Sequence, residues 1–272
     1  MHIRQDDERD EAKQELLQQA ARLAQSRRSG GAGLSEDVGS LLPVYYRHVA
    51  LEDIEDRSPT DVYGAAVSQL RLAAERPQGT ATVRVFTPTV DEHGWSADGH
   101  TVAEIVTDDM PFLVDSVTMS LARSDRSLHL VIHPQLLVQR DVTGRLVHLL
   151  RGDAERYDGV EEPADVVRES WMHVEIDRES DKAELDEIES DLVRVLRDVR
   201  EAIEDWQKMR DKAESIIAEL ADDPPPLDSE QVTEASELLS WLADDHFTFL
   251  GYREYSLQVV DDEDALRAVP GT

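Results

Sequence analysis

The chain has 272 residues, with 59 acidic against 28 basic side chains and a formal net charge of −31. A charge of this size repels polyphosphate backbones and anionic bilayers, so we expect no unaided binding to nucleic acid or to a membrane surface. The lack of cysteine excludes disulfides, thiolate catalysis and cysteine-ligated zinc. The sequence contains no run of about 18 apolar residues, and its charged start differs from a secretory signal, so a cytoplasmic protein is predicted.

Residues 1–78 are predicted to form a helical segment. A charged helix from about Asp6 to Arg28 has a single apolar stripe, so we expect it to pack weakly. The glycine cluster GGAG at 30–33 has no strand before it, which favours a flexible connector over a dinucleotide-binding turn. Two further helices follow, and the second is predicted to start at SPTD (58–61), because serine caps helices and proline fits their first turn.

Residues 79–178 predict an α+β unit of the ferredoxin-like, ACT type. The stretch from Thr101 to Arg140 has the pattern of a strand, an acidic turn, a helix and a second strand. We expect the helix to begin near Pro111, since proline is tolerated where a helix starts. Strands are predicted at 82–86, 102–107, 128–140, 146–150 and 171–177, with a hairpin turn at Thr143-Gly144.

Two versions of this unit are open, and they differ in the strand that closes the sheet. Either Trp171–Asp177 closes it, or Phe247–Leu257 does and the intervening helices belong to the same unit. We favour the first version. In that version residues 179–246 form a separate long helical hairpin, and 247–272 hold the first strand of a following, truncated β-containing domain.

The helical pattern in 179–246 is a heptad repeat. A helix from Asp181 to Leu220 would span about five heptads and be roughly 60 Å long. Three prolines at 224–226 end it, and a shorter apolar stripe after them can fold back against it. We favour this intramolecular hairpin over an intermolecular coiled coil, and expect the excess length to contact a neighbouring subunit of a homo-oligomer. The seam consists of Leu185, Leu192, Val199, Trp206, Met209 and Ile216.

Three segments together resemble the large NAD-specific glutamate dehydrogenases of bacteria: residues 101–140, SWMHVEIDR at 170–178 and LADDHFTFLGYREY at 242–255. The resemblance runs from about Leu41 to the last residue. It implies oxidative deamination of glutamate to 2-oxoglutarate and ammonia, with NAD as hydride acceptor, by a chain several times longer. The present residues resemble its N-terminal, ACT-bearing part, so the remainder of the polypeptide is an expected partner.

No catalytic residue is carried over from that family. The sequence has no G-x-G-x-x-G motif and no helix that carries a lysine-plus-acid constellation for glutamate. We therefore expect this part to bind no cofactor and to be inactive alone, with NAD bound by the full-length enzyme.

The acidic turn before the predicted helix is the candidate ligand site. Amides of a first helical turn can bind a carboxylate, and Asp109 can bind an ammonium group, so an amino-acid effector is the ligand class. ACT modules usually carry Asp-Arg-Pro-Gly-Leu in this turn, whereas Phe112 stands here in place of the glycine, which favours a purely structural role. The candidate residues are Asp108, Asp109, Met110, Pro111, Phe112, Leu113 and Val114.

Two possible metal sites have simpler explanations. On a strand, His129 and His133 would lie about 13 Å apart, too far to share an ion. Asp108, Asp109 and Asp115 could bind a divalent cation, but capping of the helix start is the favoured role. No metal site is predicted.

Three functions are compatible with the sequence. A regulatory and assembly segment of a glutamate dehydrogenase is favoured over a free-standing acidic scaffold protein and over a small enzyme that uses carboxylates. A reading frame that ends naturally at Thr272 would favour the scaffold. An activity abolished by Asp109→Asn would favour the small enzyme.

Overall fold

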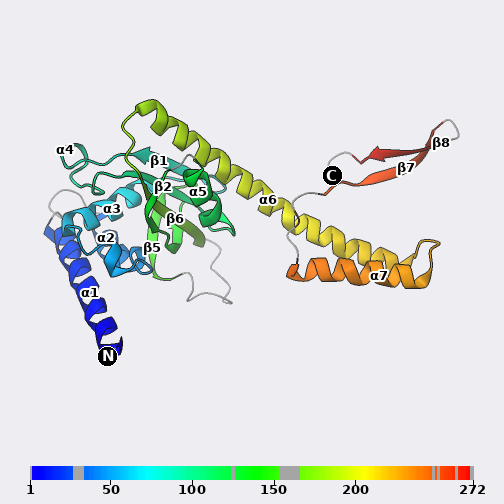
Figure 1. The fold of residues 1–272 in the computed structure, drawn as a ribbon, viewed down its shortest axis with the longest axis horizontal. Coiled ribbons are helices and arrows are strands. Elements are labelled where there is room, and N and C mark those ends of the chain that lie inside the picture. The colour runs from blue at the N-terminus through cyan, green and yellow to red at the C-terminus, as the bar shows by residue number, and fades with distance from the viewer. Residues whose placement is uncertain are drawn as a thin grey trace. The chain divides into compact units, whose positions relative to one another are not determined.

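A computed structural model shows a mixed α+β protein (Figure 1). The structure describes residues 2–26, 34–123, 126–153, 166–246, 249, 252–260 and 263–269. The chain divides into two compact units, residues 1–197 and 198–272, which are described separately. The predicted domain boundaries at 78/79, 178/179 and 246/247 stay predictions.

The first unit begins with helices: α1 (His2–Ser26), α2 (Leu34–Tyr45), the 3-10 turn η2 (Leu51–Asp53) and α3 (Pro59–Leu72). Helix α3 starts as its sequence predicts, because the Ser58 hydroxyl accepts a hydrogen bond of 3.2 Å from the Asp61 amide. The weak packing expected for α1 was wrong, since α1 packs against α2 and α3 and its Ala20 is fully buried.

Six strands form one sheet in this unit. They are β1 (Thr82–Phe86), β2 (Thr101–Asp108), β3 (Leu128–Ile132), β4 (Gln135–Arg140), β5 (Leu146–Asp153) and β6 (Val166–Ile176), with the short helix α4 (Val90–His93) before β2 and α5 (Leu113–Ala122) after it. The strand order is β1-β2-β6-β4-β5, with β3 also paired to β6, and every pairing is antiparallel. Because β2 and β3 flank opposite edges of β6, they run parallel to each other, and α5 connects them as a split βαβ unit.

The structure decides between the two closing strands. Residues 171–176 of the predicted segment lie in β6, which pairs with β2, β3 and β4 at the centre of the sheet. The described residues of the alternative segment are 249 and 252–257, and the last three of them belong to β7 (Tyr255–Val260). Strand β7 pairs with β8 (Glu263–Ala268) in a separate two-stranded sheet.

One sequence expectation for this sheet was wrong in detail. The single strand predicted at 128–140 is two strands, β3 and β4, separated at His133 and Pro134, because proline has no amide hydrogen for a strand ladder. Helix α5 begins at Leu113, near Pro111 as expected, and Pro111 itself lies in the turn before the helix. The hairpin turn at Thr143-Gly144 is confirmed between β4 and β5, with Gly144 at φ +87°.

The core of the first unit lies between the sheet and the N-terminal helices. Trp171 of β6 is fully buried there with Tyr45, which ends α2, with the adjacent Tyr46 and with Leu70 of α3. Helix α3 contacts β1 and β2, and α2 contacts β5, as Figure 1 also shows. A further helix, α6 (Lys182–Asp222), contributes its first residues to this unit, and its Glu189 carboxylate accepts a hydrogen bond of 3.2 Å from the amide of Val85 in β1.

The second unit contains the rest of α6, the helix α7 (Ser229–Trp241), the π-helical turn η4 (Leu242–His246) and the β7–β8 hairpin. Helix α6 has 41 residues, so the long helix predicted from the heptads is present. Helix α7 runs beside its C-terminal part (Figure 1), and a cavity of about 480 Å³ between them is lined by residues such as Leu220 and Val232. Of the predicted seam, Leu192, Val199 and Met209 are buried, while Leu185, Trp206 and Ile216 are half-buried.

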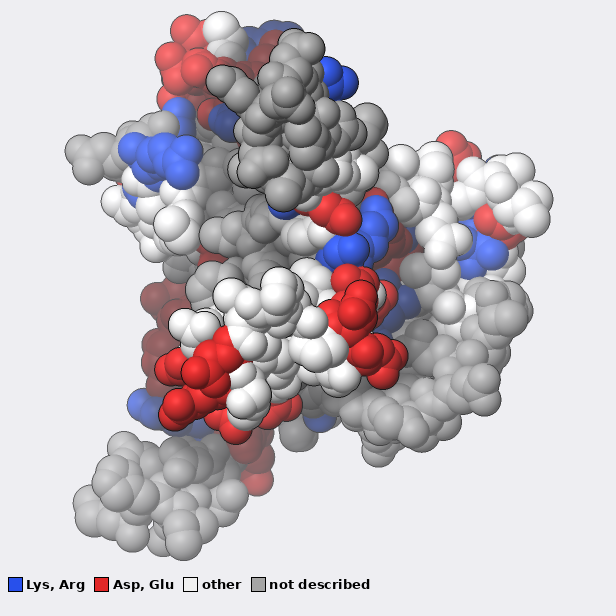
Figure 2. Space-filling model, turned by 90° about the vertical axis from the view of Figure 1, so that its right-hand side faces the viewer, with Lys and Arg blue, Asp and Glu red and all other residues white. Residues whose placement is uncertain are grey.

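Acidic side chains gather in patches on the surface, with smaller groups of Lys and Arg beside them, on the face shown in Figure 2. This distribution agrees with the net charge of −31. None of the helices in the described ranges is long and apolar enough to cross a membrane.

Candidate functional site

Asp108, at the start of the acidic turn between β2 and α5, is hydrogen-bonded within the fold. The carboxylate of Asp108 accepts hydrogen bonds from Nη2 of Arg76, at 2.6 Å, and from the amide of Gly79, at 3.1 Å. These bonds tie the end of β2 to the segment that follows α3. Asp108 therefore has a structural role in this conformation.

Asp109 has other hydrogen-bond partners than Asp108, and part of its side chain is exposed to solvent. Its amide donates to the carbonyl of Arg168 at 3.0 Å, and its two carboxylate oxygens lie 3.1 and 3.0 Å from Nε2 of Gln135. The side chain is half-buried, so a carboxylate oriented by Gln135 stays accessible at the turn. This is the acid to which a cationic ligand group could bind.

Phe112 adopts the backbone conformation that glycine favours. It has φ 65° and ψ 4° and precedes the first residue of α5 without a side-chain cap for the helix. A left-handed conformation costs a residue with a Cβ atom about 1–2 kcal/mol. The residue is 56% exposed, so Phe112 is not buried beneath the turn.

The other predicted ligand residues divide between the core and the surface. Leu113 is buried in the core, Met110 and Val114 are half-buried, and Pro111 is exposed. The turn thus brings together the carboxylate of Asp109 and the uncapped start of α5. The ligand itself stays a prediction.

A buried ionic network, which sequence reasoning missed, lies next to this turn. Glu169 of β6 is fully buried and accepts hydrogen bonds from Arg76 at 2.6 and 3.0 Å, and from Arg140 at 2.5 and 2.9 Å. The indole of Trp171 donates a further bond of 2.9 Å. The alternation of side chains along a strand could have predicted the burial of Glu169, because residues 169 and 171 lie on the same face of β6 and Trp171 is an expected core residue.

A second buried carboxylate, Glu175, lies further along the same strand. Both its oxygens accept from the Arg57 guanidinium, at 2.7 and 2.6 Å, and it also contacts His173 at 3.1 Å and His100 at 3.3 Å. Burial raises the pKa of Glu175, but the hydrogen bonds from His173 and Arg57 outweigh burial and lower the pKa to about 2. The carboxylate is thus ionised over the physiological range.

This pKa predicts how stability depends on acid. Because the pKa of Glu175 is about 2 in the folded chain against 4.5 as its ordinary value, its stabilisation is complete above pH 4.5 and is lost as the pH falls toward 2. The difference in unfolding free energy between wild type and Glu175→Gln is expected to shrink by about 3 kcal/mol across that window. Denaturant unfolding of both proteins at several pH values measures this difference in free energy, and a difference that does not change with pH would contradict the lowered pKa of Glu175.

The histidines considered as metal ligands have separate partners. His129 Nε2 lies 2.8 Å from a carboxylate oxygen of Asp177, and its ring stacks on that of His100 at 3.9 Å. His133 instead contacts the hydroxyl of the buried Ser170. Among the residues that the structure describes, His, Asp and Glu do not form a group of three or more that could hold a metal ion.

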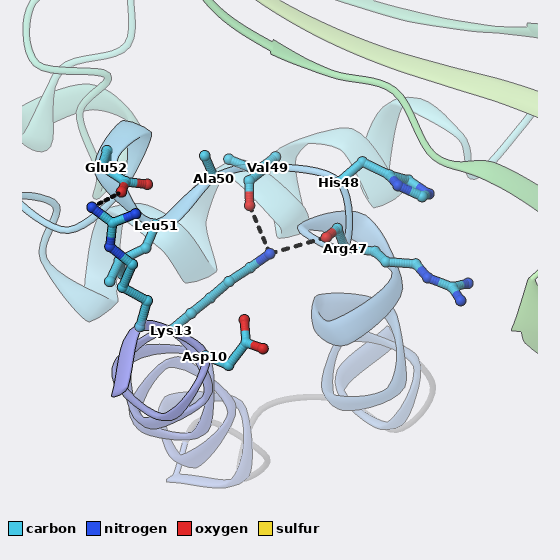
Figure 3. Close-up of a pocket in the computed structure, with 9 residues that line it drawn as sticks. Asp10, Lys13, Arg47, His48, Val49, Ala50, Leu51 and Glu52 are labelled. Atoms are coloured by element: carbon cyan, nitrogen blue, oxygen red, sulfur yellow. Dashed lines mark hydrogen bonds and ion pairs between the residues drawn. The ribbon is translucent and has the colours of Figure 1, made fainter. Parts of the chain in front are cut away.

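A pocket of about 400 Å³ lies where α1, the end of α2 and η2 meet (Figure 3). Lys13 Nζ donates to the carbonyls of Arg47 and Val49, at 3.0 and 2.6 Å, and Arg9 pairs with Glu52 at 2.9 Å. Lys13 therefore connects α1 to the residues that follow α2, and the side chain of Arg47 points away from the Lys13 amine. These contacts hold the helices together.

The fold and the turn define a mixed α+β domain in which a split βαβ unit carries an uncapped helix start. Residues 41–192 match the model of the glutamate dehydrogenase ACT1 domain, and the chain belongs to this family. The resemblance drawn from the sequence is thereby confirmed.

Three bacterial relatives are NAD-specific glutamate dehydrogenases. The protein of Halomonas elongata is 38% identical over 259 residues, which cover 95% of this chain and 15% of that protein. The protein of Pseudomonas aeruginosa is 34% identical over 225 residues, 83% of this chain and 13% of that protein. The protein of Mycobacterium tuberculosis is 28% identical over 191 residues, 67% of this chain and 11% of that protein. The chain thus spans 15% or less of the length of these relatives.

Proposed function

We propose that this chain is the N-terminal regulatory and assembly segment of an NAD-dependent glutamate dehydrogenase. The whole enzyme would convert L-glutamate, NAD and water to 2-oxoglutarate, ammonia and NADH. Family membership and the small share of each relative that the chain covers support this proposal.

The segment itself is proposed to be non-catalytic. A dinucleotide lies at the turn after the first strand of a parallel βαβ unit. In the described residues the strands pair only antiparallel, and the turn after β2 carries two acids that would repel a pyrophosphate. These residues do not fit NAD, so the hydride-transfer chemistry is assigned to the rest of the polypeptide.

The regulatory part of the proposal depends on the turn between β2 and α5. Because Phe112 opens α5 in the left-handed conformation without capping it, the first amides of α5 have no side-chain cap. An amino-acid effector would place its carboxylate at the amides of Leu113 and Val114, and its ammonium group at Asp109. This single observation favours an effector site of the ACT type over a purely architectural turn.

Thermal unfolding of the chain with a panel of amino acids tests this effector site. A ligand at a hundred times its dissociation constant stabilises the folded chain by about 2.7 kcal/mol. We expect one amino acid to raise the melting temperature and Asp109→Ala to abolish that rise. Asp56→Ala removes an exposed acid elsewhere in the same unit and serves as the matched control.

The outcomes separate the parts of the proposal. If no amino acid shifts the melting temperature, the turn is architectural and the effector is rejected. Formation of NADH from glutamate and NAD by this chain alone would instead reject its non-catalytic role.

The assembly part depends on the half-buried seam of α6. In the second unit Trp206 and Ile216 keep part of their apolar surface, and α7 contributes no buried residue to the hairpin. We expect the chain to form a homo-oligomer through this seam and Ile216→Glu to shift it toward monomer in analytical ultracentrifugation. Ala218→Glu adds the same charge at an exposed position two residues away and should leave the mass unchanged. A monomeric wild type would reject this part.

A further inference from the structure

Several buried polar atoms in the first unit have no hydrogen-bond partner. Within the part of the chain that the structure describes, these atoms are Tyr45 Oη, Gln69 Oε1, Arg84 Nε, Glu104 Oε1 and His173 Nδ1. More than nine in ten buried polar groups in folded proteins are bonded, so a set of this kind calls for a physical explanation.

The atoms belong to residues that lie side by side. Glu104 of β2 is the register partner of both Arg84 in β1 and His173 in β6, so the three side chains share one face of the sheet. The ring of Tyr45 meets the ring of His173 edge-on, with centroids 6.4 Å apart. Burial raises the pKa of the Tyr45 hydroxyl, and the charges of Tyr46, Glu104 and Glu175 raise it further.

The donor or acceptor character of three of these atoms defines the partner that each requires. His173 Nε2 lies 3.1 Å from the Glu175 carboxylate, which can only accept, so Nε2 carries a hydrogen, and in a neutral imidazole Nδ1 then presents a lone pair. Glu104 Oε1 is also an acceptor, because the other oxygen of this carboxylate is paired with Arg84. Two acceptors cannot bond to each other. The hydroxyl of Tyr45 is a donor for which no acceptor is in place.

We propose that an internal water molecule binds between α2 and the sheet, donating to Glu104 Oε1 and His173 Nδ1 and accepting from the hydroxyl of Tyr45. Water has two donors and two acceptor sites, which matches this set of two acceptors and one donor. Tyr45, Glu104 and His173 are all at least 98% buried, so the site is closed.

The water gives α2 a polar attachment to the sheet. The ring of Tyr45 meets His173 of the sheet while its hydroxyl has no hydrogen-bond partner, whereas Tyr46 donates its hydroxyl to the carbonyl of Val62 at 3.0 Å. The bonds continue from the water through His173 to Glu175 and Arg57. One hydrogen-bonded chain would thus connect α2, β2, β6 and the segment before α3.

A high-resolution crystal structure of the 272-residue chain tests the proposal. We expect a water peak within hydrogen-bond distance of Tyr45 Oη, Glu104 Oε1 and His173 Nδ1. The peak should weaken in Tyr45→Phe and stay unchanged in Tyr46→Phe, which removes an equal hydroxyl from the neighbouring residue. An unchanged peak in Tyr45→Phe would overturn the role of Tyr45.

The tautomer of His173 gives a second measurement, which needs only the wild-type chain. Imidazole ¹⁵N chemical shifts are expected to show hydrogen on Nε2 and a lone pair on Nδ1. A hydrogen on Nδ1, together with a direct bond to Glu104 Oε1, would overturn the proposal, because the two atoms would then satisfy each other without water.

Discussion

Replacement of Glu169 by glutamine is expected to destabilise the first unit by about 3–5 kcal/mol, the usual cost of breaking a buried ion pair from one side. Glu169 neutralises two guanidinium groups that water hardly reaches, since the side chain of Arg76 is fully buried and that of Arg140 is 4% exposed. A neutral amide keeps the shape but removes the charge. The free energy of unfolding, measured with denaturant, reports the loss.

The matched control is Glu52→Gln, because Glu52 also pairs with an arginine, Arg9, at 2.9 Å but on the surface. Exposed pairs contribute about 0–1 kcal/mol, so this variant should unfold close to wild type. Equal effects of the two substitutions would show that burial does not govern the strength of the Glu169 network.

Replacement of Gly144 by alanine is expected to cost about 2–4 kcal/mol, from backbone strain and overpacking together. Gly144 has φ +87°, and a Cβ atom there would lie 2.5 Å from the carbonyl oxygen of Arg76 and 2.7 Å from its carbon. The obstacle is backbone, which cannot rotate away. The carbonyl of Gly144 also accepts from the Arg76 amide at 2.9 Å and from Arg140 at 2.8 Å, so a shift of the turn would disturb the Glu169 network as well.

Gly79→Ala separates the two contributions. Gly79 has a similar φ of +78°, but a Cβ atom there meets nothing within 4 Å. Only the conformational cost of about 1 kcal/mol should remain. If both variants lose the same stability by denaturant unfolding, the close approach of the hairpin turn to Arg76 is wrong.

The elements that the sequence predicts well are those whose signal is local. The helix start at Ser58 and the hairpin at Gly144 depend on capping and turn chemistry within a few residues, and both are present. The 41-residue helix α6 was predicted from its heptad repeat, which is also a pattern within one continuous segment. The break at Pro134 was missed because the apolar, branched residues on either side have one continuous strand pattern.

The candidate turn illustrates the limit of local reasoning. The sequence places Asp108 and Asp109 side by side before a helix, and the structure shows that Arg76 engages the first and Gln135 orients the second. These partners come from distant parts of the chain, so spacing within the turn could not predict them. Phe112 likewise takes a left-handed conformation that its residue type disfavours, and the turn pattern of the sequence does not predict it.

The acidic, cysteine-free character of this protein, most of its helical and strand segments, and its resemblance to NAD-specific glutamate dehydrogenases follow from the order of its residues, because composition, periodicity and motifs are local properties of the chain. The central place of β6 in the sheet, and the inward position of Glu169 and Glu175 beside arginine partners, became known from the folded structure. A charged residue can be buried only where the fold supplies its counterions, and these lie 29 and 93 residues away for Glu169 and 118 residues away for Glu175.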